Sequence, residues 1–101
     1  MPAPRMNAVC CSGVAPKVEI TSEGRGGSIF HVEDGQHTRF DWEFAMPPAI
    51  ALVFGPGPAA FESAERRAQV YDTVARELVR QKSPGGSFSV DLANSRIDIL
   101  R

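Results

Sequence analysis

The stretch that decides the fold is residues 28–44, Ser-Ile-Phe-His-Val-Glu-Asp-Gly-Gln-His-Thr-Arg-Phe-Asp-Trp-Glu-Phe. Apolar and polar residues alternate on both sides of Asp34 and Gly35. An Asp-Gly pair between two alternating segments is a strong signal for a β-hairpin. Because successive residues of a strand point to opposite faces of a sheet, the length of the loop decides which side chains lie together.

Two loop lengths give two registers for this hairpin. A two-residue loop would place Ile29 and His31 on one face with Phe40 and Trp42. A three-residue loop over residues 33–35 shifts the pairing by one residue. The face that it produces carries Phe30, Val32, Thr38, Phe40, Trp42 and Phe44. We expect the second register, because it buries every large apolar side chain of the hairpin together.

The opposite face of this expected hairpin carries the residues with possible chemistry. The second register sets His31 directly across from His37. Two opposed imidazoles can supply part of a Zn²⁺ site or respond to pH near neutrality. His31 and His37 are therefore the candidate metal ligands. The candidate interaction face around them consists of Ile29, Arg39, Asp41 and Glu43.

The rest of the chain predicts further strands and a single long helix. Alternation predicts strands over residues 17–22, 87–93 and 96–100, and the run at 49–54, apolar at every position, is typical of a strand covered on both faces. Apolar residues recur at helical spacing over 58–82, with Pro58 in the first turn and Val70 on the exposed side. The final hairpin is expected to turn at Asn94 and Ser95.

This order of elements, ββββ-α-ββ, predicts an α+β fold of two layers. In it, one long amphipathic helix packs on one face of a mainly antiparallel sheet. The 101 residues are enough for one domain, which we place at residues 16–101. Residues 1–15 contain Pro2, Pro4 and Gly13 and show no periodicity, so we expect a disordered N-terminal arm there. The only cysteines, Cys10 and Cys11, fall in that arm and are expected to be reduced thiols.

Composition and charge narrow the classes of function. The formal net charge is −1, and no basic stripe appears, so we expect no nucleic-acid partner. Neither a membrane-spanning apolar run nor a signal-peptide pattern is found, so we expect a cytoplasmic protein without a membrane partner. No catalytic constellation and no cofactor motif are recognisable, which favours a non-catalytic role with no cofactor.

The sequence thus favours a small protein-interaction or adaptor module whose partner is a protein, either a second copy of itself or another chain. The apolar run at 49–54 is the main reason to consider a homodimer. The alternative is a small-ligand- or metal-responsive domain that uses the face of His31 and His37. A third hypothesis, an inhibitor of the immunity-protein type, rests on the acidic positions Asp41, Glu43, Asp91 and Asp98.

Overall fold

The computed structural model describes residues 16–101 and contains six strands and one long helix. The strands are β1 (Lys17–Ile20), β2 (Gly26–Glu33), β3 (Gln36–Phe44), β4 (Ala49–Phe54), β5 (Ser87–Asp91) and β6 (Arg96–Leu100). The helix is α1 (Ala64–Lys82), and short 3-10 turns cover Pro58–Ala60 and Leu92–Asn94. The residues 1–15 that we predict to form an arm, with Cys10 and Cys11, lie outside the described part of the chain.

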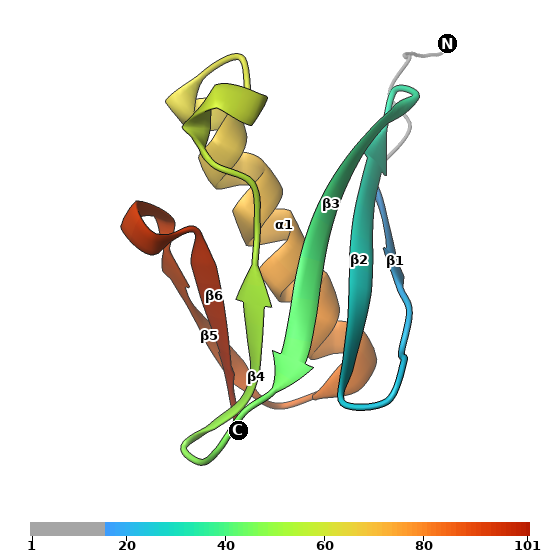
Figure 1. The fold of residues 1–101 in the computed structure, drawn as a ribbon, viewed down its shortest axis with the longest axis vertical. Coiled ribbons are helices and arrows are strands. Elements are labelled where there is room, and N and C mark those ends of the chain that lie inside the picture. Colours follow the sequence, from blue (N-terminus) through green and yellow to red (C-terminus); the bar gives the residue numbers. More distant parts are fainter. Residues whose placement is uncertain (1–15) are drawn as a thin grey trace, which may run out of the picture.

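All six strands form one antiparallel sheet in the order β1-β2-β3-β4-β6-β5, and α1 lies across one of its faces (Figure 1). The helix connects β4 to β5, which is an edge strand, and β6 returns to fill the place between those two strands. The predicted fold class, an α+β two-layer arrangement with the order ββββ-α-ββ, is confirmed.

The predicted register of the β2–β3 hairpin is wrong. His31 pairs with Thr38 and Val32 pairs with His37, so the loop consists of Asp34 and Gly35 alone. Both loop residues have positive φ, 51° and 77°, as a type I′ turn requires. This turn matches the twist of the flanking strands, and that local preference outweighs the gathering of all the apolar side chains on one face.

Strand β1 supports the same register from the other side of β2. Its apolar residues Val18 and Ile20 pair with His31 and Ile29. Because directly paired residues share a face, the alternation of β1 requires Ile29 and His31 to face the helix. Ile29 is fully buried there. Its assignment to an exposed interaction face is therefore wrong.

The helix begins later than predicted. Pro58 lies in the 3-10 turn, and α1 starts at Ala64, where the Ser63 hydroxyl caps it by accepting a hydrogen bond from the backbone N–H of Arg66. The predicted end at Lys82 is confirmed. Val70 is buried rather than exposed, because the side of α1 that meets the twisted sheet includes it.

The hairpin of β5 and β6 also has a longer connection than predicted. Val90 pairs with Ile97, and the turn takes in residues 92–95, ending at Ser95 in a left-handed conformation. Arg67 of α1 is almost fully buried beside this turn and donates hydrogen bonds to the Leu92 carbonyl (2.9 Å) and the Ser95 hydroxyl (2.8 Å). Its guanidinium therefore ties the first half of the helix to the β5–β6 turn.

The core lies between α1 and the sheet. The sheet contributes Val18, Ile29, Phe40, Val53, Ile97 and Ile99, and the helix contributes Val70, Tyr71, Val74, Ala75 and Leu78. Tyr71 packs edge-on against Phe40 at 5.0 Å between ring centroids and donates a hydrogen bond to the Pro56 carbonyl. We call the sheet face turned away from α1 the outer face. Within residues 16–101, no helix has the length and apolarity needed to cross a membrane.

Candidate functional site

A depression with a mostly apolar lining lies where the end of α1 meets the ends of β1, β3, β4 and β6 that are lowest in Figure 1. Its volume is about 530 Å³. We call it the aromatic groove. It is lined by Ile20, Ser22, Trp42, Phe44, Ala45, Pro47, Ala49, Ile50, Ala51, Leu78, Lys82, Ser83, Ile99 and Arg101.

Two aromatic side chains from the end of β3 form one wall of the aromatic groove. The rings of Trp42 and Phe44 meet edge to face at 5.0 Å between centroids. The Trp42 indole N–H donates to the Thr21 carbonyl at 2.8 Å, so the indole is held and its only donor is occupied. Phe44 is 62% exposed, although it lies on the same face of β3 as the buried Phe40 and the partly buried Trp42.

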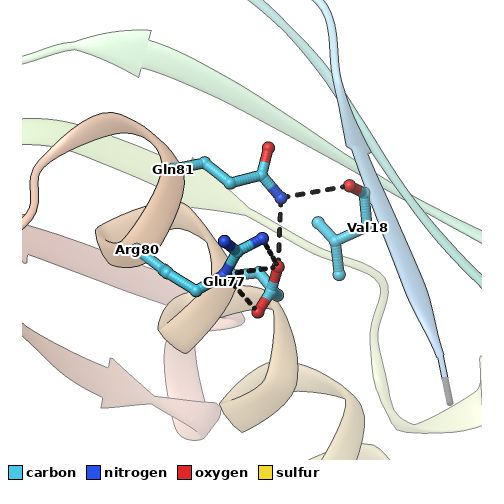
Figure 2. Close-up of polar contacts among 4 residues, drawn as sticks. All are labelled: Val18, Glu77, Arg80 and Gln81. Atoms are coloured by element: carbon cyan, nitrogen blue, oxygen red, sulfur yellow. Dashed lines mark hydrogen bonds and ion pairs between the residues drawn. The ribbon is translucent and has the colours of Figure 1, made fainter.

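The opposite wall comes from the last turns of α1, which a polar cluster fixes against β1 (Figure 2). The Gln81 side-chain amide donates to the Val18 carbonyl of β1 and to the Glu77 carboxylate. Arg80 donates three further hydrogen bonds to the same carboxylate, at 2.8, 3.0 and 3.2 Å. Hydrogen bonds from Arg80 and then Gln81 lower the pKa of Glu77. The bond from Gln81 to Val18, at 3.4 Å, links the end of α1, which carries Leu78 and Lys82, to the sheet.

The charge of the aromatic groove is one-sided. Lys82 and Arg101 contribute the only charged side chains among its lining residues, and both are cationic. Neither makes an ion pair with another side chain of residues 16–101. Ser22 and Ser83 add hydroxyl groups at the rim. The site therefore offers an apolar floor with positive charge beside it, which suits a ligand that has an apolar body and an acidic group.

A second, smaller depression of about 190 Å³ lies at the other end of α1. We call it the His31 cleft. It is lined by His31, Gln36, Thr38, Ala60, Phe61, Glu62, Arg66 and Val70. His31 is only 2% exposed, and burial lowers its pKa below the ordinary value of 6.5. Glu33 raises the pKa of the same imidazole and Arg66 lowers it, and these two residues form an ion pair between the end of β2 and the first turn of α1.

The two predicted metal ligands do not come together. His31 faces α1, whereas His37 is exposed on the outer face, where it pairs with Val32. The arrangement on which the metal hypothesis depended is therefore absent. No cluster of three or more histidine, cysteine or acidic side chains suited to a metal ion occurs within the described residues.

The other members of the predicted interaction face separate in the same way. Arg39, Asp41 and Glu43 are exposed on the outer face, and the Arg39 guanidinium lies 3.2 Å from the Asp41 carboxylate. Ile29 lies in the core on the opposite side of the sheet. Three of the four residues thus share a surface, but the apolar residue among them does not.

Sequence reasoning missed the aromatic groove, because its walls come from five elements that are far apart along the chain. One local signal could have pointed to it. Phe44 continues the alternation of Trp42 and is followed by Met46 and two prolines, so apolar side chains extend beyond the point where a strand can continue. Comparison with family models, curated proteins and solved structures finds no match to this chain.

Proposed function

We propose that this protein is a small, non-catalytic interaction module, and that the aromatic groove binds a segment of a partner protein with apolar side chains next to acidic ones. The observation that carries the proposal is the edge-to-face pair of the partly buried Trp42 and the exposed Phe44, which lies beside two cationic side chains. Aromatic side chains at the centre of a contact and charges at its rim are the usual anatomy of a protein interface.

The apolar part supplies most of the binding free energy. Covering the exposed part of Phe44 would contribute about 1–2 kcal/mol, and the remaining apolar lining would add to it. Little ordering is needed first, because Trp42 is already held by its bond to Thr21 and the helix wall by Gln81. A preformed groove loses less entropy on binding than a flexible one.

The charged part selects the partner. Lys82 and Arg101 favour acidic groups next to the apolar anchor, and no acidic side chain in the lining offsets them. Charges at the rim of an interface act mainly on specificity and association rate. Binding should therefore weaken as salt is added, while the preference for an apolar anchor remains.

The experiment is a selection from a library of random displayed peptides against the full chain. We expect enriched peptides to carry an aromatic or aliphatic residue flanked by aspartate or glutamate. Phe44→Ser should abolish the enrichment, and Lys82→Glu should remove the preference for acidic flanks. Phe54→Ser is the matched control, because Phe54 is also an exposed aromatic residue but lies on the outer face.

Trp42 gives a direct reading in solution, since it is the only tryptophan of the chain. Its fluorescence emission should change when a selected peptide is titrated in, and should not change in Phe44→Ser. A selection that enriches nothing, or that enriches the same peptides in the wild type and in Phe44→Ser, would contradict the proposal.

A further inference from the structure

The outer face carries alternating apolar and charged strands. β2 presents Phe30 and β4 presents Leu52 and Phe54, whereas the strands on either side of β4 present charged residues. Phe54 is 40% exposed, and within residues 16–101 no helix or strand covers this face. From this arrangement we propose that the outer face binds a second copy of the chain, with the two sheets packed face to face.

The argument for a second copy is one row of paired residues across the centre of the sheet. Phe54 of β4 pairs with Asp41 of β3 on one side and with Arg96 of β6 on the other. The row therefore has a negative side chain, an apolar side chain and a positive side chain at the same height. When a copy of this row is rotated by half a turn about an axis along β4, its charges are opposite to those of the original row.

The direction of the two-fold axis follows from these charges. An axis parallel to β4, between the two sheets, places β3 of one copy over β6 of the other. Asp41 then faces Arg96 of the second copy twice, and the two Phe54 rings meet on the axis. An axis perpendicular to the strands would instead put Asp41 over Asp41 and Arg96 over Arg96. Within this row, only the parallel axis pairs opposite charges, and an interface of two-fold symmetry needs a surface that is complementary to itself.

The twist of the sheets permits this contact near the axis. The strands of two packed sheets cross at about 30°. Residues that face each other across the interface are therefore displaced least at the strand on the axis and more at strands farther from it. Both charged residues of the row are immediate neighbours of that strand. They also already have ion-pair partners in their own copy, Arg39 for Asp41 and Asp98 for Arg96, which limits the cost of removing them from water.

The neighbouring row, through Leu52, pairs like charges in the proposed dimer, and this gives the proposal a further test. Leu52 pairs with Glu43 on one side and Asp98 on the other. The parallel axis therefore sets Glu43 over Asp98 of the second copy, which brings like charges together. Glu43→Lys should tighten the dimer, whereas an axis perpendicular to the strands gives this variant no opposite charge to face.

The experiment is light scattering of the full chain after size exclusion, over a dilution series. We expect a dimer that dissociates on dilution. Phe54→Lys and Phe54→Asp should each weaken it by roughly tenfold or more, because like charges then meet on the axis. A mixture of these two variants should form dimers again, because opposite charges then meet. Phe44→Lys, the same change in the aromatic groove, is the matched control and should leave the dimer intact.

A separate variant tests the direction of the two-fold axis. Asp41→Asn should weaken the dimer if Asp41 faces Arg96, and should strengthen it if Asp41 faces Asp41. A wild-type protein that stays monomeric at every concentration overturns the proposal. A dimer that Phe54→Lys leaves intact, or a mixture of the Phe54 variants that stays monomeric, overturns the assignment of this face. Peptide binding in the aromatic groove is measured separately, so either proposal can fail without the other.

Discussion

The two ends of the interface between α1 and the sheet each carry a depression, and the two depressions differ in size and polarity. At the beginning of the helix the His31 cleft is small and its lining is largely polar, and the ion pair of Glu33 and Arg66 stands beside it. At the end of the helix the aromatic groove is almost three times as large and mostly apolar. The polar end is closed within the chain, whereas the apolar end is left open.

The polar end is closed and the apolar end is open because polar and apolar side chains differ in what it costs to leave them without a partner. A buried polar group must find partners inside the chain, because leaving it without them costs about 1–3 kcal/mol. Near the beginning of α1, Tyr71 bonds to the Pro56 carbonyl, and Arg67 bonds through Nη2 to the Leu92 carbonyl and the Ser95 hydroxyl. Of the buried side-chain atoms described there, only the Arg67 Nε is left without a partner. An exposed apolar side chain costs less to leave in water, and it is available to a partner. The open end is therefore where we expect binding.

The largest expected effect on stability comes from a substitution at Tyr71, in the core between α1 and the sheet. Tyr71→Ala removes a fully buried ring that packs on Phe40 and Phe61, and it also removes the hydrogen bond to Pro56. The free energy of unfolding should fall by about 3–5 kcal/mol. Urea denaturation followed by circular dichroism measures this loss. A loss below about 1 kcal/mol would show that the ring is not packed as described.

A smaller loss is expected from a change that reaches only the open end. A Cβ added at Gly27 would run into the Thr21 carbonyl and would lie 2.9 Å from the Trp42 indole nitrogen. Gly27→Ala should therefore cost about 1–3 kcal/mol and should shift the fluorescence of Trp42. Gly57→Ala is the control, because no atom lies within 4 Å of the added Cβ. Equal stability of the two variants would contradict the close packing of Gly27 against Thr21 and the Trp42 indole.

His31, at the closed end, should make the free energy of unfolding depend on pH. Burial lowers the pKa of His31 in the folded state, so at mildly acidic pH the unfolded chain binds a proton that the folded chain does not. The free energy of unfolding should therefore fall as the pH is lowered through the ordinary value of 6.5 toward the folded-state pKa. Denaturation curves between about pH 5.5 and 8 test this.

Two variants separate His31 from the other groups that titrate. His31→Leu should flatten the pH dependence, whereas His37→Gln should retain it, since His37 is exposed on the outer face and His31 stays buried. The nearby charged groups are Glu33, Glu62 and Arg66. A slope that persists unchanged in His31→Leu would assign the effect to the carboxylates instead.

The smallest effect on stability is expected at the residue that matters most for the proposed function. Phe44→Ser should change the free energy of unfolding by less than about 0.5 kcal/mol, because most of the ring is already in water. The same substitution should abolish peptide binding. A large loss of stability would mean that the ring supports the fold, and the contrast between the two ends would disappear.

Much of this fold could be predicted from local patterns, because alternation and helical spacing are set by which side of each element meets the core. The strands, the end of α1 at Lys82 and the two-layer class follow from them. The β2–β3 register could not be settled from the hairpin alone. The turn at Asp34 and Gly35 competed with a pattern that buried more apolar surface, and β1 was needed to decide.

The candidate site was less predictable for a related reason. His31 and His37 were grouped because of the register, and a shift of one residue moves a side chain to the other face. The aromatic groove depends on how α1 lies across the sheet, which the spacing of apolar residues along the helix does not specify. Lys82 and Phe44 are thirty-eight positions apart and line the same groove only because of that placement.

The position of β6 between β4 and β5 has a consequence for the order in which the protein can be made. Strand β4, Ala-Ile-Ala-Leu-Val-Phe, is the most apolar segment of the described chain, and β6 covers one of its two edges. During synthesis, β4 leaves the ribosome more than forty residues before β6 does. For that time its free edge can pair with another nascent chain, as apolar edges without charge readily do. Conditions that slow translation between these strands should therefore raise aggregation more than conditions that slow it earlier.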